Sequence, residues 1–180
     1  MPDIPQILIA HLQKLEPDAK FTGSLPAIQS STGTRYFGKI GSLSEKDQYI
    51  GETESLKAMN KAAPGLSPFV VASGFVDGSG VESSMGRPYF LSEYKDLGRL
   101  TNKAADVLAK RLATELHGYK SSNGFGFEVP TFCGATRQEN GWYESWEECY
   151  SEMIGSLLEK LKQKGKFGDL CSKGSEVRRK

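Results

Sequence analysis

The sequence predicts an α+β fold, in which a five-stranded antiparallel sheet with one packed helix precedes a helical region. Two observations support this prediction. Before residue 95 the sequence contains five short candidate strands, and a longer amphipathic segment separates the third from the fourth. After residue 95, apolar residues recur at helical spacing. We therefore expect two parts, residues 1–94 and residues 95–180.

The composition shows balanced charge. The 180 residues include 23 Lys and Arg against 22 Asp and Glu, a formal net charge of +1. This balance gives no reason to expect a nucleic acid or a membrane surface as a partner. The three cysteines and two histidines show no metal-ligand spacing, so a zinc site is not expected. With no leader-like or membrane-spanning segment and with free thiols, we expect a cytoplasmic protein.

The first part opens with a helix and three strands. Asp3 and Pro5 form a helix-start signal, because Asp can cap a helix and proline fits its first turn. Apolar residues then recur at helical spacing as far as Glu16. Candidate strands follow at residues 19–23, 27–31 and 35–40. A polar turn at residues 31–34 suits a hairpin between the last two strands.

A long helix is expected at residues 44–63, where Pro64 and Gly65 end the pattern. Its inner face carries Tyr49, Leu56 and Met59. Glu52 falls within this apolar stripe, and a buried carboxylate is costly unless a cation faces it. Lys39, near the end of the third strand, is the expected partner because a helix that follows a strand packs back against it. The alternative is that Glu52 lies at the edge of the stripe and reaches solvent.

Two apolar segments complete the predicted sheet. Residues 68–76 and 88–94 are short and rich in β-branched or aromatic residues, so both are expected to be strands. A loop at residues 77–87 connects them as a hairpin. After Tyr94 the composition changes, and residues 95–98 are expected to form a hinge.

The second part is expected to begin with a helix that Asn102 caps and that ends near Lys120. Its apolar face carries Ala105, Leu108, Leu112, Leu116 and Tyr119. Another helix is expected to start at Glu144 or Ser145. Its inward face would carry Trp146, Tyr150, Met153, Leu157 and Leu161. Beyond Gly165 the apolar pattern fades, so the tail is expected to have no core of its own.

Between these helices, residues 123–146 predict an ordered aromatic loop. Glycines and Pro130 interrupt any helical period. The aromatic residues are Phe125, Phe127, Phe132, Trp142 and Trp146. Arg137, Gln138 and Asn140 lie among them and could form hydrogen bonds. Long ordered loops are often functional, and a packed loop without a ligand is the alternative.

The order of elements is that of the amino-terminal lobe of a protein kinase: a lysine on the third strand, a glutamate on the next helix and a hinge after the fifth strand. The loop is more specific. Phe125-Gly126-Phe127, a Thr-x-Cys-Gly turn, Gln138-x-Asn140-x-Trp142 and Trp146 closely resemble the ketosamine-3-kinase family, also called fructosamine-3-kinase or protein-ribulosamine 3-kinase. The resemblance extends from residue 35 to about residue 161 and includes Tyr36–Lys39, Gly51-Glu52 and Phe90–Tyr94.

The resemblance implies a protein-kinase-like fold and an activity. Members of the family use ATP and Mg2+ to phosphorylate the sugar C3 hydroxyl of a ribulosamine or fructosamine on a protein lysine. The sugar then leaves and the lysine is restored. Glycated proteins or small ketosamines would therefore be the substrates.

The resemblance also implies site residues. Lys39 would bind the phosphates of the nucleotide, and Glu52 would hold Lys39 in place. The adenine edge would be lined by Ser92, Glu93 and Tyr94, largely through backbone groups. The larger lobe would support the site through Gln138, Asn140 and Trp142.

The chain departs from the family at the catalytic loop, whose pattern His-Gly-Asp-Leu-Trp-x-Gly-Asn supplies the base and a metal ligand. Phe167 and Cys171 stand where the histidine and the tryptophan would be, so Asp169 is expected on the surface and not as the base. The Asp-Pro of the other metal ligand does not occur. We therefore expect a truncated member with an incomplete helical lobe and no measurable phosphotransfer. The alternative function is a non-catalytic chain that binds nucleotide or a partner.

Overall fold

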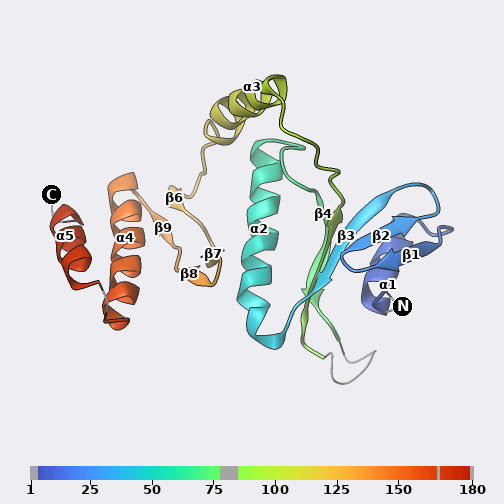
Figure 1. Ribbon diagram of the computed structural model, residues 1–180, viewed down its shortest axis with the longest axis horizontal. Coiled ribbons are helices and arrows are strands. Elements are labelled where there is room, and N and C mark those ends of the chain that lie inside the picture. The colour runs from blue at the N-terminus through green and yellow to red at the C-terminus, as the bar shows by residue number, and fades with distance from the viewer. Residues whose placement is uncertain (1–3, 78–84, 166, 179–180) are drawn as a thin grey trace. The chain divides into compact units, whose positions relative to one another are not determined.

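The computed structural model describes residues 4–77, 85–165 and 167–178 (Figure 1). The chain forms two compact units, Met1–Tyr119 and Lys120–Lys180. The predicted α+β architecture with a five-stranded antiparallel sheet is confirmed. The functional division at residue 94 stays a prediction. Among the described residues, no helix is both long and apolar enough to cross a membrane.

The first unit is built on the sheet, whose strand order is β1-β2-β3-β5-β4 with antiparallel neighbours. The strands are β1 (Phe21–Ser24), β2 (Ala27–Ser30), β3 (Arg35–Ile40), β4 (Val70–Phe75) and β5 (Pro88–Glu93). The interior position of β5, between β3 and β4, explains why its residues 88–92 are all buried. Most of the predicted loop between β4 and β5 falls on residues 78–84, which lie outside the described residues.

Helix α1 (Gln6–Leu15) packs on one face of this sheet. The shared core consists of Leu8, Leu12, Ile28, Tyr36, Tyr89 and Leu91. Just after the helix, the Glu16 carboxylate accepts hydrogen bonds from the hydroxyls of Ser30, Thr32 and Tyr36. These bonds tie the end of α1 to the β2–β3 hairpin.

Helix α2 (Lys46–Ala62) packs against β4 and β5 (Figure 1). A 3-10 turn, Leu43–Glu45, precedes it, and Ser42 with Glu45 forms a capping box in which Ser42 N donates to Glu45 Oε2 at 2.7 Å. The helix ends before Pro64 and Gly65, as predicted. The start of α2 is therefore fixed directly after β3.

Helix α3 (Asn102–Arg111) continues into a π-helical turn, Leu112–Leu116. The predicted cap is wrong by one residue, because Thr101 Oγ1 accepts a hydrogen bond from Ala104 N at 3.2 Å. Asn102 is instead the first residue of the helix. No residue of α3 is buried. On its predicted apolar face Ala105, Leu112 and Leu116 are half-buried, whereas Leu108 and Tyr119 are exposed.

In the second unit, the predicted loop is ordered, but it contains two short strand pairs that the sequence prediction omits. Strand β6 (Phe125–Gly126) pairs with β9 (Trp142–Tyr143), and β7 (Thr131–Cys133) pairs with β8 (Thr136–Gln138). Gly126 has a φ of +138°, and a Cβ there would collide with the carbonyl oxygen of Gly141. Only glycine therefore allows β6 to approach β9 in this way.

Helices α4 (Trp146–Gln163) and α5 (Gly168–Arg178) complete the second unit. The tail, predicted to have no core of its own, forms helix α5 and packs on α4, where Cys171 is 3% exposed and lies at Leu158. Gly174 explains the close packing, since a Cβ there would lie 2.6 Å from Leu158 Cδ2.

The predicted inward orientation of Trp146 and Tyr150 is also wrong. These side chains are 56% and 51% exposed, whereas Cys149 and Leu158 are buried. Helical spacing correctly places Trp146 and Tyr150 on one face of α4. The buried residues, however, lie on a neighbouring face of this helix.

Candidate nucleotide site

Lys39 and Glu52 form the predicted ion pair across the first unit. Lys39 Nζ lies 2.5 Å from Glu52 Oε2, and the two side chains are 30% and 37% exposed. This confirms the prediction that Glu52 faces Lys39, while the open side of the pair still reaches solvent. A lysine held in this way can present its charge to a phosphate group.

Aromatic rings flank the lysine. Its Nζ lies 4.7 Å from the centre of the Tyr49 ring and 5.5 Å from the centre of the Phe90 ring. Phe90 is directly opposite Lys39 in the β3–β5 register, so β5 supports the lysine from the neighbouring strand. In the capping box before α2, the hydrogen bonds from Ser42 lower the pKa of the Glu45 carboxyl group and keep this group ionised.

The predicted adenine edge lies at the end of β5. Ser92 is 2% exposed, and its hydroxyl donates to Glu93 O at 3.1 Å. The amide of Glu93 donates to Phe69 O at 3.0 Å, and the amide of Tyr94 donates to Arg35 O at 3.1 Å. Both amide groups are therefore already used in backbone hydrogen bonds to neighbouring segments. Recognition of a nucleotide base at this edge would depend on backbone carbonyl groups or on the residues that follow. The role of these residues stays a prediction.

Arg35 contacts the predicted hinge at residues 95–98, and no sequence pattern indicated this contact. Its Nη1 donates to Asp96 Oδ1 at 2.8 Å and to Oδ2 at 2.7 Å, and its Cζ lies 3.8 Å from the centre of the Tyr94 ring. The bond to Asp96 raises the pKa of Arg35. The guanidinium group thus holds both Tyr94 and Asp96 beside β3.

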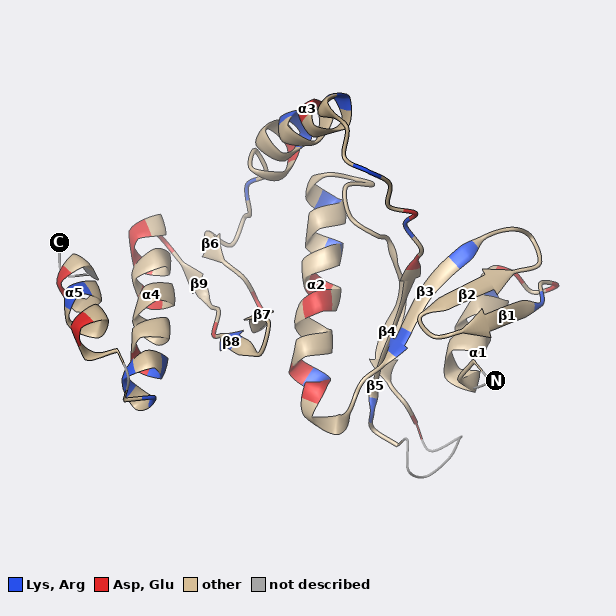
Figure 2. Ribbon diagram, viewed as in Figure 1, with Lys and Arg blue, Asp and Glu red and all other residues tan. Residues whose placement is uncertain are grey.

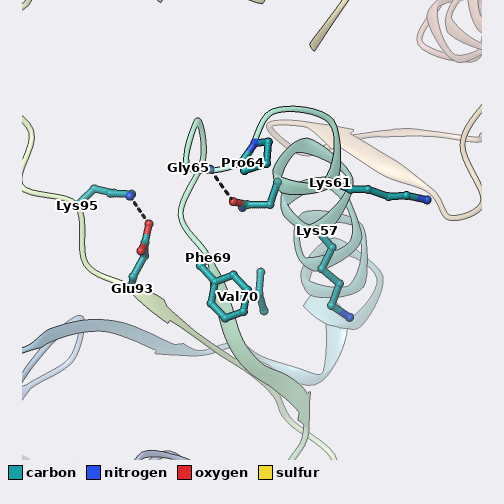
Figure 3. A pocket seen from close by; sticks show the side chains of 9 residues that line it. Lys57, Lys61, Pro64, Gly65, Phe69, Val70, Glu93 and Lys95 are labelled. Carbon is teal, nitrogen blue, oxygen red and sulfur yellow. Dashed lines mark hydrogen bonds and ion pairs between the residues drawn. The ribbon is translucent and has the colours of Figure 1, made fainter. Parts of the chain in front are cut away.

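Figure 3 shows a pocket of about 520 Å³ between α2, the turn that follows it and the end of β5. Lys57, Lys61 and Lys95 contribute positive charge, and Phe69 forms part of the apolar wall. Glu93 forms an ion pair with Lys95 at one edge. Sequence reasoning missed this pocket because its cations come from separate elements.

Asn60 fixes the turn beside that pocket. Its Nδ2 donates to Ser67 Oγ at 2.8 Å and to Pro68 O at 2.9 Å. Its Oδ1 accepts a bond from Gly65 N at 3.3 Å, which Figure 3 draws as a dashed line. One amide group therefore connects the end of α2 to the beginning of β4.

The predicted residues of the aromatic loop act within the second unit. Asn140 Nδ2 donates to Val129 O at 2.8 Å and to Thr131 Oγ1 at 3.0 Å, which links two segments within the loop. Gln138 Nε2 is buried without a hydrogen-bond partner in the described part of the chain. Trp142 lies in β9 and is 37% exposed. Their support of a nucleotide site stays a prediction.

Asp169 lies in the first turn of α5 and is exposed, which confirms its predicted surface position. Within residues 4–77, 85–165 and 167–178, no group of three or more His, Cys, Asp or Glu side chains could hold a metal ion. The expectation that this chain holds no ligand of the Mg2+ site stays a prediction.

Known proteins resemble this chain in sequence and fold. The fructosamine kinase family model matches residues 22–178. The chloroplastic protein-ribulosamine 3-kinase of Arabidopsis thaliana is 38% identical over 71 residues, which is 39% of this chain and 22% of that protein. A probable ketoamine kinase of Vibrio parahaemolyticus is 26% identical over 132 residues, which is 73% of this chain and 43% of that protein.

A crystal structure from Haemophilus somnus 129PT, described as a fructosamine-3-kinase, shares the fold. It superposes with a TM-score of 0.63 at 21% sequence identity, over 88% of this chain and 54% of that chain. The chain thus spans less than half the length of the curated relatives it matches and about half of this structure.

Proposed function

The chain belongs to the fructosamine kinase family, and from this premise we propose that it supplies the nucleotide-binding part of a ketosamine 3-kinase. In this reaction ATP would give its γ-phosphoryl group to the C3 hydroxyl of a ribulosamine or fructosamine. The sugar would be attached to a protein lysine, so that phosphorylation leads to deglycation. Glycated proteins or small ketosamines would be the substrates.

The observation that supports this proposal is the Lys39–Glu52 pair. Lys39 would bind the α- and β-phosphates of ATP, because its ammonium group is held at the surface by a carboxylate and two aromatic rings. Glu52 would position Lys39 and would not contact the nucleotide. The proposal gives this chain no metal ligand, because neither the family's His-Gly-Asp-Leu-Trp-x-Gly-Asn pattern nor its Asp-Pro occurs in the sequence.

A second candidate is nucleotide binding without phosphotransfer. The specific observation is Asp169, whose Gly-Asp-Leu context most resembles the catalytic loop of the family. In the structure this aspartate is exposed and lies in the first turn of α5. It therefore has the position of a helix-start residue, for which a carboxylate is favourable in any case.

The test is to measure ATP binding and phosphotransfer on the same full chain. ATP binding would be followed by calorimetry, and transfer by mass spectrometry of a ribulosamine-modified protein incubated with ATP and Mg2+. We expect ATP binding that Lys39→Met weakens at least about tenfold, while the exposed Lys103→Met has no effect. Binding with transfer would support the kinase, and binding without transfer would support the second candidate. If the chain binds no ATP, both proposals are wrong.

A further inference from the structure

The ammonium group of Lys39 is attracted by more than one carboxylate, so Glu52 alone does not fix its position. Figure 2 shows acidic residues in the first turn and in the middle of α2. The pKa of Glu45 is lowered by the bonds from Ser42 and also by the charge of Lys39. A lysine stem is flexible, and the Lys39–Glu52 pair is about one-third exposed. A further contact is therefore needed to hold the ammonium group in one place.

The ring of Tyr49 supplies such a contact. Lys39 Nζ lies 4.7 Å from the centre of this ring, within the distance at which the face of an aromatic ring attracts a cation. Tyr49 lies about one turn before Glu52 on α2, so the ring and the carboxylate both reach Lys39 from the same helix. The ring of Phe90 is farther from Nζ, at 5.5 Å. Tyr49 is therefore the aromatic residue with the closer contact.

Tyr49 is itself fixed at the start of α2. Its side chain is buried, with an exposed fraction of 9%. Burial raises the pKa of its hydroxyl group above the ordinary value of 10, with smaller effects from Glu45 and Glu52. The hydroxyl group therefore stays protonated at neutral pH, and a neutral ring presents its face to Lys39.

Gly41 provides the space for this ring. It follows Lys39 by two residues, so it lies on the same face of the strand, and its amide donates to Pro88 O at 2.8 Å. A Cβ at Gly41 would lie 2.6 Å from Tyr49 Cε2 and 3.0 Å from Pro88 Cγ. Arg87 Nε donates to Gly41 O at 2.7 Å, which fixes the backbone there. The ring can lie beside Lys39 because Gly41 has no side chain.

We propose that Tyr49 is a positioning residue for Lys39, whose ammonium group it holds by the face of its ring, and that Gly41 leaves the room for this ring. The ring attracts the cation without neutralising it, so the charge of Lys39 remains available to an anion. The phosphate groups of ATP are that anion if the proposed function is correct, and this step rests on it. The contact between the ring and Lys39 can be tested without a nucleotide.

The first test is NMR spectroscopy of the full chain without ATP. The face of an aromatic ring moves the signals of nearby protons upfield, so the ε-methylene signal of Lys39 should be shifted upfield. Lys39→Met identifies this signal by removing it. Tyr49→Phe should keep the shift, because the ring is retained, and Tyr49→Leu should lose most of it.

The second test is the rate at which acetic anhydride labels Lys39, measured by mass spectrometry relative to the exposed Lys103. Labelling should be severalfold faster in Tyr49→Leu, because the ammonium group is then less restrained, and unchanged in Tyr49→Phe. Calorimetry with ATP should show severalfold weaker binding for Tyr49→Leu only. Gly41→Ala should resemble Tyr49→Leu in all three measurements, because the added methyl group displaces the ring while the tyrosine remains in the chain.

Leu12→Ala is the control for a general loss of stability. Leu12 is fully buried between α1 and the sheet. It lies on the opposite face of the sheet from Lys39, because the neighbouring Gly38 faces Leu8 of the same helix. This variant should unfold more easily, yet it should keep the Lys39 signal, the labelling rate and ATP binding. Circular dichroism shows whether each variant is folded under the conditions of the measurement.

Two results would overturn the inference. In the first, the Lys39 signal and its labelling rate are the same in Tyr49→Leu as in the wild type. In the second, Leu12→Ala changes them as much as Tyr49→Leu does. Altered labelling with unchanged ATP binding would overturn the role of Tyr49 in nucleotide binding. If the wild type binds no ATP, the proposed function is wrong, and the two measurements without nucleotide still decide whether Tyr49 positions Lys39.

Discussion

Arg35 and Asp96 lie 61 positions apart in the sequence and share two hydrogen bonds that join the first residue of β3 to the hinge. The same guanidinium group covers the ring of Tyr94. The hinge is therefore held by side-chain contacts in addition to the sheet bond from Tyr94 N. Contacts of this kind limit the positions that the backbone after β5 can adopt.

Arg35→Ala should loosen the hinge and weaken nucleotide binding. We expect faster amide hydrogen exchange in residues 93–97 and an ATP dissociation constant several times larger, because the hinge would have to be ordered on binding. Hydrogen-exchange mass spectrometry and calorimetry measure the two effects. Arg99→Ala is the control, since Arg99 is exposed in the same segment. Unchanged exchange in Arg35→Ala would show that the sheet alone orders the hinge.

Lys39→Met and Glu52→Gln should affect ligand binding much more than stability. The pair is about one-third exposed, so its loss should change the free energy of unfolding by about 1 kcal/mol or less. We expect both variants to unfold in urea at nearly the wild-type midpoint and to bind ATP at least about tenfold more weakly. If the double variant is no weaker than either single variant, the two side chains act as one unit. A large loss of stability would contradict this assignment.

Glu16 should make the first unit sensitive to acid. Hydrogen bonds from Thr32, Tyr36 and Ser30 lower the pKa of this carboxylate below its ordinary value of 4.5. A carboxylate with a lowered pKa contributes stability above its unfolded-state pKa and loses it as the pH falls through the folded-state pKa. Glu16→Gln should therefore lower the melting temperature at neutral pH, and the difference from wild type should shrink below about pH 4.5.

Tyr36 provides an independent check on this network. Burial and the bond to Glu16 raise the pKa of Tyr36 to about 12. Tyr36→Phe removes one donor, so the pKa of Glu16 should rise and the acid transition of the variant should begin at higher pH. The exposed Asp18→Asn is the control. Identical pH profiles for Tyr36→Phe and wild type would contradict the role of this bond.

Gly126→Ala should disrupt the second unit. The positive φ and the collision with the Gly141 carbonyl leave no place for a Cβ, so β6 could not pair with β9. We expect Phe125 to separate from Trp146 and the tryptophan fluorescence maximum to shift, with a loss of about 1–3 kcal/mol in the free energy of unfolding. Gly134→Ala is a matched control, because its φ is also positive but nothing lies within 4 Å of its Cβ position. Equal effects of the two substitutions would show that backbone strain alone, and not the β6–β9 approach, determines the result.

The sequence predicts the Lys39–Glu52 pair well because both partners follow from local patterns. The strand places Lys39, the apolar stripe of the next helix places Glu52, and a strand followed by a helix brings the two together. The Arg35–Asp96 pair has no such signal, since neither residue lies in a periodic stripe and the hinge has no regular structure. Exposed ion pairs between distant segments depend on the three-dimensional fold.

The second unit was predicted less well, and for a physical reason. Periodicity identifies Trp146 and Tyr150 as one face of a helix, but it does not say which face the neighbouring elements cover. Helix α5 gave no apolar stripe because its packing on Leu158 depends on one cysteine and on a glycine that permits close approach. Neither residue type appears as a periodic apolar signal.

The burial of the cysteines has a practical consequence for kinetics. Cys133 is exposed, whereas Cys149 and Cys171 are buried in the helical part of the second unit. Burial also raises the pKa of the Cys149 thiol, which lowers its thiolate fraction. A thiol reagent should therefore modify Cys133 at once and the other two only when α4 and α5 open. The rate of the slow phase of this reaction therefore measures local unfolding of the two helices, and no label has to be introduced into the protein.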